Sequence, residues 1–144
     1  MTFALENHMD YRAGELAQVL REVNAPHIRA TFDTGNPVSV LEDSVEAARH
    51  LSSFSRIVHL KDLRIQPLTI HGVPMIFGCP LGEGNIDLKA IWKILQQEPQ
   101  ADLMICVDLV PHRTANSRLW LETSLRFVRH ELCQFEPGPM EVNQ

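Results

Sequence analysis

Four residues of this chain could ligate a divalent metal ion, and each stands at the end of a short apolar run. They are Glu6, Asp33, His59 and Asp108. The first three stand 27 and 26 residues apart, which is close to the length of one βα unit. Oxygen donors joined by one imidazole suit Mn²⁺, Mg²⁺ or Co²⁺ better than a thiolate-seeking metal. The recurrence predicts one metal site made by these four side chains.

Each candidate ligand also has a simpler explanation when it is taken alone. A carboxylate after a strand often only caps the next helix or faces solvent. His59, between Val58 and Leu60, could be a hydrogen-bonded core histidine. The fourfold recurrence at equivalent positions favours a shared site. Three carboxylates at one rim would repel each other unless a cation compensates their charge. We therefore expect the four side chains to converge on one point, where that cation would bind.

Alternating strand-like and helix-like segments predict the scaffold of this site. Strands are expected at 2–5, 28–32, 56–60 and 102–107, and helices at 10–23, 43–51, 88–97 and 117–133. Four βα units in this order predict an α/β fold with a parallel sheet, whose strand ends share one rim. Two architectures remain open: an open doubly wound sheet, or part of a (β/α)₈ TIM barrel.

Local signals refine the expected helices. Aspartates at Asp10, Asp43 and Asp87 stand where three helices should begin, and an aspartate can cap the first turn. Helical spacing predicts two buried faces. The first consists of Leu16, Val19, Leu20 and Val23, and the second, in the last helix, of Leu121, Leu125, Val128 and Leu132.

The segment between the third strand and the third helix breaks the βα rhythm. Strands at 63–70 and 73–77 around His71-Gly72 predict a β-hairpin insertion. The glycine-rich loop that follows could bind a phosphate, but it lacks the lysine of a P-loop, so a turn into the next helix is the simpler explanation. We expect one domain over residues 1–135 and a loose tail over 136–144.

Four short motifs follow one another in the order of a known family. They are LENH at 5–8, FDTGNP at 32–37, HLKD at 59–62 and PLGEGNID at 80–87. Together they resemble the C-terminal half of the xylose-isomerase-like TIM barrels. That family holds sugar and sugar-phosphate isomerases and epimerases, inosose dehydratases and endonuclease IV. The resemblance covers roughly residues 2 to 131.

The resemblance implies roles for particular residues. The family places Glu, Asp, His and Glu at the ends of its fifth to eighth strands around one divalent cation. Glu6, Asp33 and His59 match that set, and Asp108 stands where a glutamate is expected. By the same resemblance, Glu6 and Asp108 form the catalytic acid/base pair, moving a proton through an enediolate.

The resemblance also implies a small sugar, sugar phosphate or polyol as substrate, with three residues as candidate contacts. Asn36 stands where several epimerases carry a histidine, and His8 follows the first ligand closely. Lys61 could reach a sugar hydroxyl or phosphate, although a surface cation paired with Asp62 explains it equally well.

Composition and charge exclude several classes of protein. The chain has 144 residues, of which 44% are hydrophobic and 22% charged, as expected for one globular domain. A net charge of −5 without a basic stripe argues against a nucleic-acid partner. The longest apolar run, 103–107, is far shorter than the roughly 20 residues of a membrane span. Three cysteines without a CxxC spacing are typical of a reducing, cytoplasmic location.

Length leaves three hypotheses for function. A whole TIM barrel takes about 250 residues, so this chain holds about half of one. The first hypothesis is a metal-dependent isomerase or epimerase, truncated or split. The second is a non-catalytic half-barrel or assembly subunit, and the third and weakest is an endonuclease IV-like phosphodiesterase. Because half a barrel leaves two open sheet edges, we expect a homodimer or a separately encoded N-terminal half as partner.

Overall fold

A computed structural model of the protein describes residues 1–67, 74–98 and 102–133. Within these residues one sheet contains four parallel strands in the order β1-β2-β3-β6. Their bounds are Phe3–Glu6 (β1), Ile28–Asp33 (β2), Ser55–Leu60 (β3) and Met104–Val107 (β6). The expected parallel α/β fold is confirmed. The parallel strands lie side by side in the order in which they follow one another along the chain. A doubly wound sheet would reverse its strand order at one point, so this order indicates a segment of a barrel.

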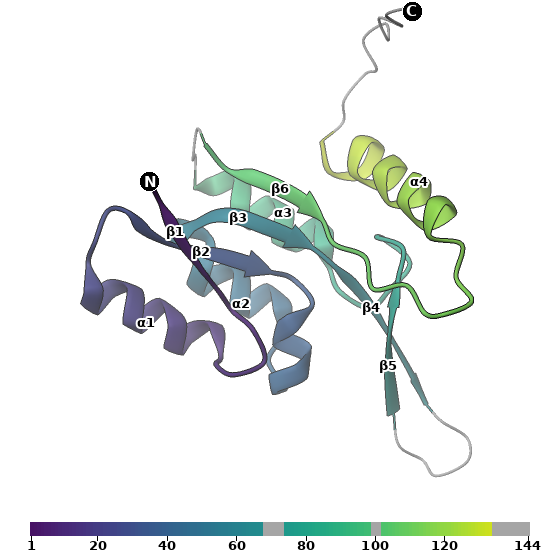
Figure 1. Ribbon diagram of the computed structural model, residues 1–144, viewed down its shortest axis with the longest axis horizontal. Coiled ribbons are helices and arrows are strands. Elements are labelled where there is room, and N and C mark those ends of the chain that lie inside the picture. The colour runs from purple at the N-terminus through teal and green to yellow at the C-terminus, as the bar shows by residue number, and fades with distance from the viewer. Residues whose placement is uncertain (68–73, 99–101, 134–144) are drawn as a thin grey trace, which may run out of the picture.

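Helices follow the strands along the chain. They are α1 (Ala13–Val23), α2 (Ser44–Leu51), α3 (Leu88–Gln97) and α4 (Ser117–Phe127), with short turns η1 (Asn36–Val40), η2 (Ser52–Phe54) and η3 (Val128–Leu132). In Figure 1, α1, α2 and α3 cover one face of the sheet, and α4 stands beyond the β6 edge. None of the helices in the described ranges is long and apolar enough to cross a membrane.

The hydrophobic core lies between the sheet and these helices. Phe32 and Val58, which pair in register, are fully buried against the helices. Side chains alternate between the two faces of a strand, so their neighbours Asp33 and His59 point to the other face. The strand pattern therefore turns the polar strand ends away from the core and toward the face that α1, α2 and α3 leave free.

The predicted aspartate cap at Asp87 is confirmed, and Asp43, where a helix was expected to begin, caps α2. Asp43 accepts hydrogen bonds from the backbone of Val45 and Glu46, and Asp87 accepts one from Ala90. The predicted cap at Asp10 is wrong, because the N-cap residue of helix α1 is Arg12. Helix α1 begins at Ala13, and its first backbone N–H groups donate to the carboxylates of Glu15 and Glu42 instead. A glutamate from another segment supplies what a local aspartate was expected to supply.

The buried helix faces also differ from those that the apolar spacing predicts. Helix α1 buries Ala13, Leu16, Ala17 and Leu20, whereas Val19 and Val23 are about half exposed. Small alanines let α1 pack closely, which rotates its valines outward. In α4 the buried residue is Ser124, whose hydroxyl accepts a hydrogen bond from the backbone of Leu81, and Leu121 and Leu125 stay exposed. The other two predicted residues, Val128 and Leu132 in η3, do pack in the core.

The hairpin insertion is confirmed. β4 (Asp62–Pro67) pairs antiparallel with β5 (Pro74–Cys79). In Figure 1 the pair projects away from the main sheet near the end of β3. The expected turn at His71-Gly72 and the expected tail over 136–144 lie outside the described residues.

Candidate metal and active site

Three of the four predicted ligands come together at the carboxyl ends of neighbouring strands. Glu6 and Asp33 are the last residues of β1 and β2, and His59 is the last but one of β3. One ligand atom from each lies within 4.8 Å of the others. His59 Nδ1 is 3.9 Å both from Glu6 Oε1 and from Asp33 Oδ2. We call Glu6, Asp33 and His59 the acidic cluster.

The donor set of the cluster fits a hard divalent cation. Asp33 is fully buried, and its Oδ1 accepts hydrogen bonds from the backbone of Gly35 and Asn36 at 2.7 and 3.0 Å. Its Oδ2 is buried without a hydrogen bond of ordinary geometry. A buried carboxylate oxygen with unused acceptor capacity is costly unless a positive charge faces it. The cluster therefore has the ligand types for a cation, and Asp33 Oδ2 needs a positive charge opposite it.

Lys61 supplies part of that positive charge. Its Nζ lies 2.7 Å from Asp33 Oδ2 and 2.9 Å from Asp108 Oδ2. Burial lowers the pKa of the Lys61 amine, but Asp33 and Asp108 outweigh it and raise the pKa above 10.5, so the amine is charged at neutral pH. The alternative pairing of Lys61 with Asp62 is wrong. Lys61 therefore lies inside the site and is not a surface cation, as a substrate contact would require.

Asp108 joins the site through this lysine. Its backbone N–H donates to the carbonyl of Leu60, which continues the pairing of β6 with β3. Its carboxylate meets Lys61 Nζ, and Asp108 does not belong to the three-residue cluster. An aspartate is one methylene shorter than the glutamate expected there, so the ammonium of Lys61 stands between the fourth carboxylate and Asp33.

Two residues of the loop after β2 hold Lys61 in place. Thr34 Oγ1 donates to the carbonyl of Lys61 at 2.7 Å and accepts from its backbone N–H at 2.8 Å. A Cβ atom at Gly35 would lie 2.6 Å from Lys61 Cδ, so only glycine leaves room for the lysine stem. The Thr-Gly pair of the FDTGNP motif was the available signal for this role, which sequence reasoning missed.

The two asparagines of the site have different roles. Asn36 Nδ2 donates to Glu6 Oε1 at 3.1 Å, and Lys61 Nζ lies 3.5 Å from Asn36 Oδ1. The predicted substrate contact thus lies at the site and orients the first ligand. Asn7, which sequence reasoning left without a role, is buried and forms two hydrogen bonds with the backbone of Asp33. It joins the ends of β1 and β2, and its place directly after Glu6 was the only sequence signal.

His8 takes no part in the acidic cluster. Its side chain is 54% exposed, and its Nδ1 lies 4.0 Å from Asp10 Oδ2 at the surface. An exposed side chain after the strand end can still meet a ligand that enters from solvent. Its substrate contact stays a prediction.

The completed arrangement is a charged rim with three carboxylates, one imidazole and one ammonium. Such a set can hold a divalent cation, bind hydroxyl groups and exchange protons with a bound substrate. All of its members come from strand ends or the loops directly after them. This is the location of active sites in α/β barrels.

Comparison with known proteins agrees with this architecture. A family model for the xylose isomerase-like TIM barrel matches residues 1–130. YihM of Escherichia coli K12, an uncharacterized protein, is 26% identical over 91 residues, which are 63% of this chain and 27% of YihM. This chain therefore spans only part of the length of that relative.

Two solved structures share the fold. A xylose isomerase-like TIM barrel protein from Mycobacterium smegmatis in complex with magnesium has a TM-score of 0.73 at 14% identity, covering 90% of this chain and 43% of its own. The IOLI protein with a bound zinc atom has a TM-score of 0.68 at 17% identity, covering 96% and 51%. The family match spans most of the chain, and three of the four motifs, at 5–8, 32–37 and 59–62, lie at the carboxyl ends of parallel strands. This protein belongs to the xylose isomerase-like TIM barrel family.

Proposed function

We propose that this chain carries the metal site of a sugar isomerase or epimerase that acts on a small sugar, sugar phosphate or polyol. The observation that supports this most is the convergence of Glu6, Asp33 and His59 around the buried Oδ2 of Asp33. These three side chains would hold one divalent cation, Mn²⁺, Mg²⁺ or Co²⁺. Asp108 would complete the set once Lys61 turns toward a substrate.

The residues around the cluster suggest how a proton would move. A bound divalent cation would stabilise negative charge on the substrate oxygens. Glu6 Oε1 is engaged by Asn36, which leaves Oε2 to accept the proton beside the carbonyl. Asp108, on the other side of Lys61, would take up a proton from solvent and deliver it to the opposite face of the enediolate, which inverts the carbon, and Glu6 would release its proton to solvent. Lys61 would donate a hydrogen bond to a hydroxyl or phosphate oxygen of the substrate.

The acidic cluster opens to the face that the helices α1, α2 and α3 leave free, so a complete pocket needs further chain. Edge strands β1 and β6 expose apolar side chains, including Phe3, Leu5 and Met104. We propose that a second copy, or a separately encoded N-terminal half, pairs with both edges and closes an eight-stranded barrel. A homodimer is our first expectation. A sharp monomer of 16.3 kDa in sedimentation, with a cooperative melt, would contradict this assembly.

Metal binding and chemistry can be tested separately. Mn²⁺, Mg²⁺ or Co²⁺ at millimolar concentration should raise the melting temperature of the metal-free protein and release protons. Proton transfer is measured as exchange of the α-proton of ketoses for deuterium in D₂O, followed by NMR. Asp108→Asn should abolish inversion of the carbon, which the same NMR spectra report as formation of the epimer, and should retain both proton exchange through Glu6 and most of the thermal shift.

Two outcomes would contradict parts of the proposal. The absence of any thermal shift would remove the metal site. A shift without exchange on any ketose or ketose phosphate, in the assembled protein, would remove the enzymatic function and favour the non-catalytic half-barrel.

A further inference from the structure

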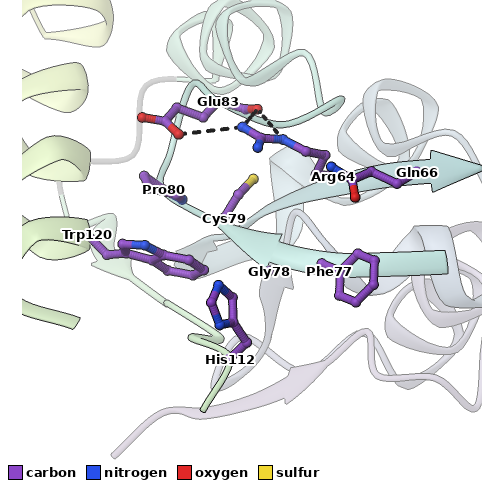
Figure 2. Close-up of a pocket in the computed structure, with 9 residues that line it drawn as sticks. All are labelled: Arg64, Gln66, Phe77, Gly78, Cys79, Pro80, Glu83, His112 and Trp120. Atoms are coloured by element: carbon purple, nitrogen blue, oxygen red, sulfur yellow. Dashed lines mark hydrogen bonds and ion pairs between the residues drawn. The ribbon is translucent and has the colours of Figure 1, made fainter. Parts of the chain in front are cut away.

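A cleft of about 450 Å³ lies between the β4–β5 hairpin and helix α4. Six side chains around it carry the argument: Arg64, Phe77, Cys79, Glu83, His112 and Trp120. Figure 2 shows the rings of His112 and Trp120 side by side at one end, Phe77 at the other, and Arg64 with Glu83 along one wall. The cleft shares no residue with the acidic cluster, and its volume falls in the range of small-molecule sites.

The walls are held in place by contacts between separate elements. A Cβ atom at Gly78 would lie 2.1 Å from the carbonyl oxygen of Val110, so the loop after β6 rests directly on the hairpin backbone. His112 and Trp120 pack edge to face with centroids 5.4 Å apart. Thr114 Oγ1 lies 3.1 Å from His112 Nδ1, which leaves Nε2 for another partner. The cleft is therefore largely formed before any ligand enters.

Hydrogen-bonding groups occupy the opposite wall. Arg64 Nε and Nη2 donate to the carbonyl oxygen of Glu83 at 3.2 and 2.7 Å, and Nη2 lies 3.5 Å from Glu83 Oε2. These contacts fix the guanidinium and leave its Nη1 group without a hydrogen-bond partner among the described residues. Because the cation and the carboxylate compensate each other, this wall offers donors and acceptors without a net charge.

The thiol on the cleft floor is chemically inert. Cys79 is buried, and burial, assisted by Asp62, raises the pKa of its thiol to about 12. It stays protonated at neutral pH and acts as a small apolar group. The cleft thus combines a flat aromatic end, an apolar floor and a neutral polar wall.

We propose that this cleft binds a neutral sugar ring, stacked on Trp120 and hydrogen-bonded at its edge by Arg64, Glu83 and His112. A pyranose has one face of C–H groups, which suits an aromatic surface, and hydroxyls around its edge, which suit paired donors and acceptors. A phosphate or carboxylate ligand would find the charge of Arg64 already compensated by Glu83. This site goes beyond the proposed function and does not depend on the metal.

The test uses the full-length protein and four probes, the methyl pyranosides of glucose, galactose, mannose and xylose. Each is titrated to about 50 mM, since weak small-molecule sites have millimolar dissociation constants. The chain has two tryptophans, so two indole N–H resonances report on binding. At least one probe should shift the Trp120 resonance saturably. The Trp92 resonance should stay in place, because Trp92 packs against the core.

Variants separate a specific site from general effects. Arg64→Met should weaken binding of the active probe at least 5-fold. Trp120→Phe removes the reporter resonance, so its affinity is measured by isothermal titration, and it should weaken binding less. Lys89→Met, which breaks an exposed ion pair elsewhere, is the matched control and should leave affinity unchanged. Asp33→Asn should also leave it unchanged, which distinguishes this site from the metal site. The melting temperature of each variant checks its folding.

Three results would overturn the proposal. The first is no saturable shift of Trp120 with any of the four pyranosides. The second is an equal shift of Trp120 by inorganic phosphate. The third is retention of full affinity in a folded Arg64→Met protein.

Discussion

Two buried aspartates, Asp33 at the end of β2 and Asp62 two residues after β3, differ in the partners of their carboxylate oxygens. Asp62 is 1% exposed and accepts backbone N–H groups of Leu63, Gly82, Gly84 and Ile86 at 2.9 to 3.3 Å. Asp33 is 0% exposed, and the hydrogen bonds to its side chain all reach Oδ1. Its Oδ2 faces Lys61 and the acidic cluster.

The difference separates a carboxylate that only backbone N–H groups engage from one that also faces charged side chains. Both oxygens of Asp62 are used by the chain, so it closes the loop between β5 and α3 and has no capacity for a ligand. Burial raises the pKa of Asp62, and the four N–H donors act in the opposite direction. Asp33 uses one oxygen to fix its own loop, and the other pairs with Lys61 and faces His59. Burial and residue type are the same in both, and only the partners distinguish them.

The largest expected effect in this comparison is the loss of stability in Asp62→Ala. The substitution leaves four backbone N–H groups without their acceptor, and buried unsatisfied donors cost about 1–3 kcal/mol each without adding fully. We expect the free energy of unfolding to fall by about 3 kcal/mol or more, measured by urea denaturation. A fall below about 1 kcal/mol would mean that water replaces the carboxylate easily.

The loop that Asp62 holds should be almost as sensitive at Gly84. A Cβ atom there would lie 2.0 Å from Asp62 Oδ1 and 2.7 Å from the carbonyl oxygen of Leu63. Gly84→Ala should cost about 1–3 kcal/mol, as for other substitutions that overpack a site. The matched control is Gly14→Ala in helix α1, where a Cβ atom would lie 3.6 Å from the nearest atom, His50 Nε2. That change should be neutral or slightly stabilising. Equal effects of the two would contradict the loop packing described here.

Asp33→Asn should change stability less and metal binding more. The asparagine Oδ1 can still accept from the backbone of Gly35 and Asn36, but its amide NH2 group would face the ammonium of Lys61. We therefore expect the free energy of unfolding to fall by about 1–3 kcal/mol, because Lys61 keeps only its ion pair with Asp108. The charged ligand oxygen is lost, and the Mn²⁺ affinity should fall at least 10-fold, the lower bound for disturbed metal sites. Isothermal titration of the variant against the wild type measures this. Unchanged Mn²⁺ affinity would show that Asp33 is not a metal ligand.

The smallest expected effect concerns an exposed carboxylate, Glu131, paired with Lys89. The hydrogen bond and charge of Lys89 lower the pKa of Glu131 below 4.5. A lowered carboxyl pKa adds stability that is present above 4.5 and is lost as the pH falls through the lower folded value. Lys89→Met should remove that small pH dependence and leave stability at pH 7 nearly unchanged, since exposed pairs contribute little. Thermal melts between pH 7 and pH 3 test it, and a large loss at pH 7 would contradict the exposure of the pair.

The elements of this fold were largely readable from local patterns. Strand and helix positions follow from the spacing of apolar residues, and the caps at Asp43 and Asp87 follow from residue type. The acidic residues at the strand ends, together with His59, could be identified as one set because their spacing repeats. These signals are local, so they do not depend on which segments meet in space.

The contacts that give each residue its role depend on how distant segments pack. Lys61 reaches Asp33 and Asp108 because β3 lies between β2 and β6, and no local pattern distinguishes that contact from a pair with Asp62. The exposure of Val19 and Leu121 likewise depends on which neighbour covers each helix. Apolar spacing shows that a helix has a buried face, but the size of the packed side chains sets its direction. The types of side chain at the rim could therefore be read from the sequence. The pairing of the Lys61 charge with Asp33 and Asp108 is set only by the tertiary structure, because it requires the ends of the parallel strands to lie side by side.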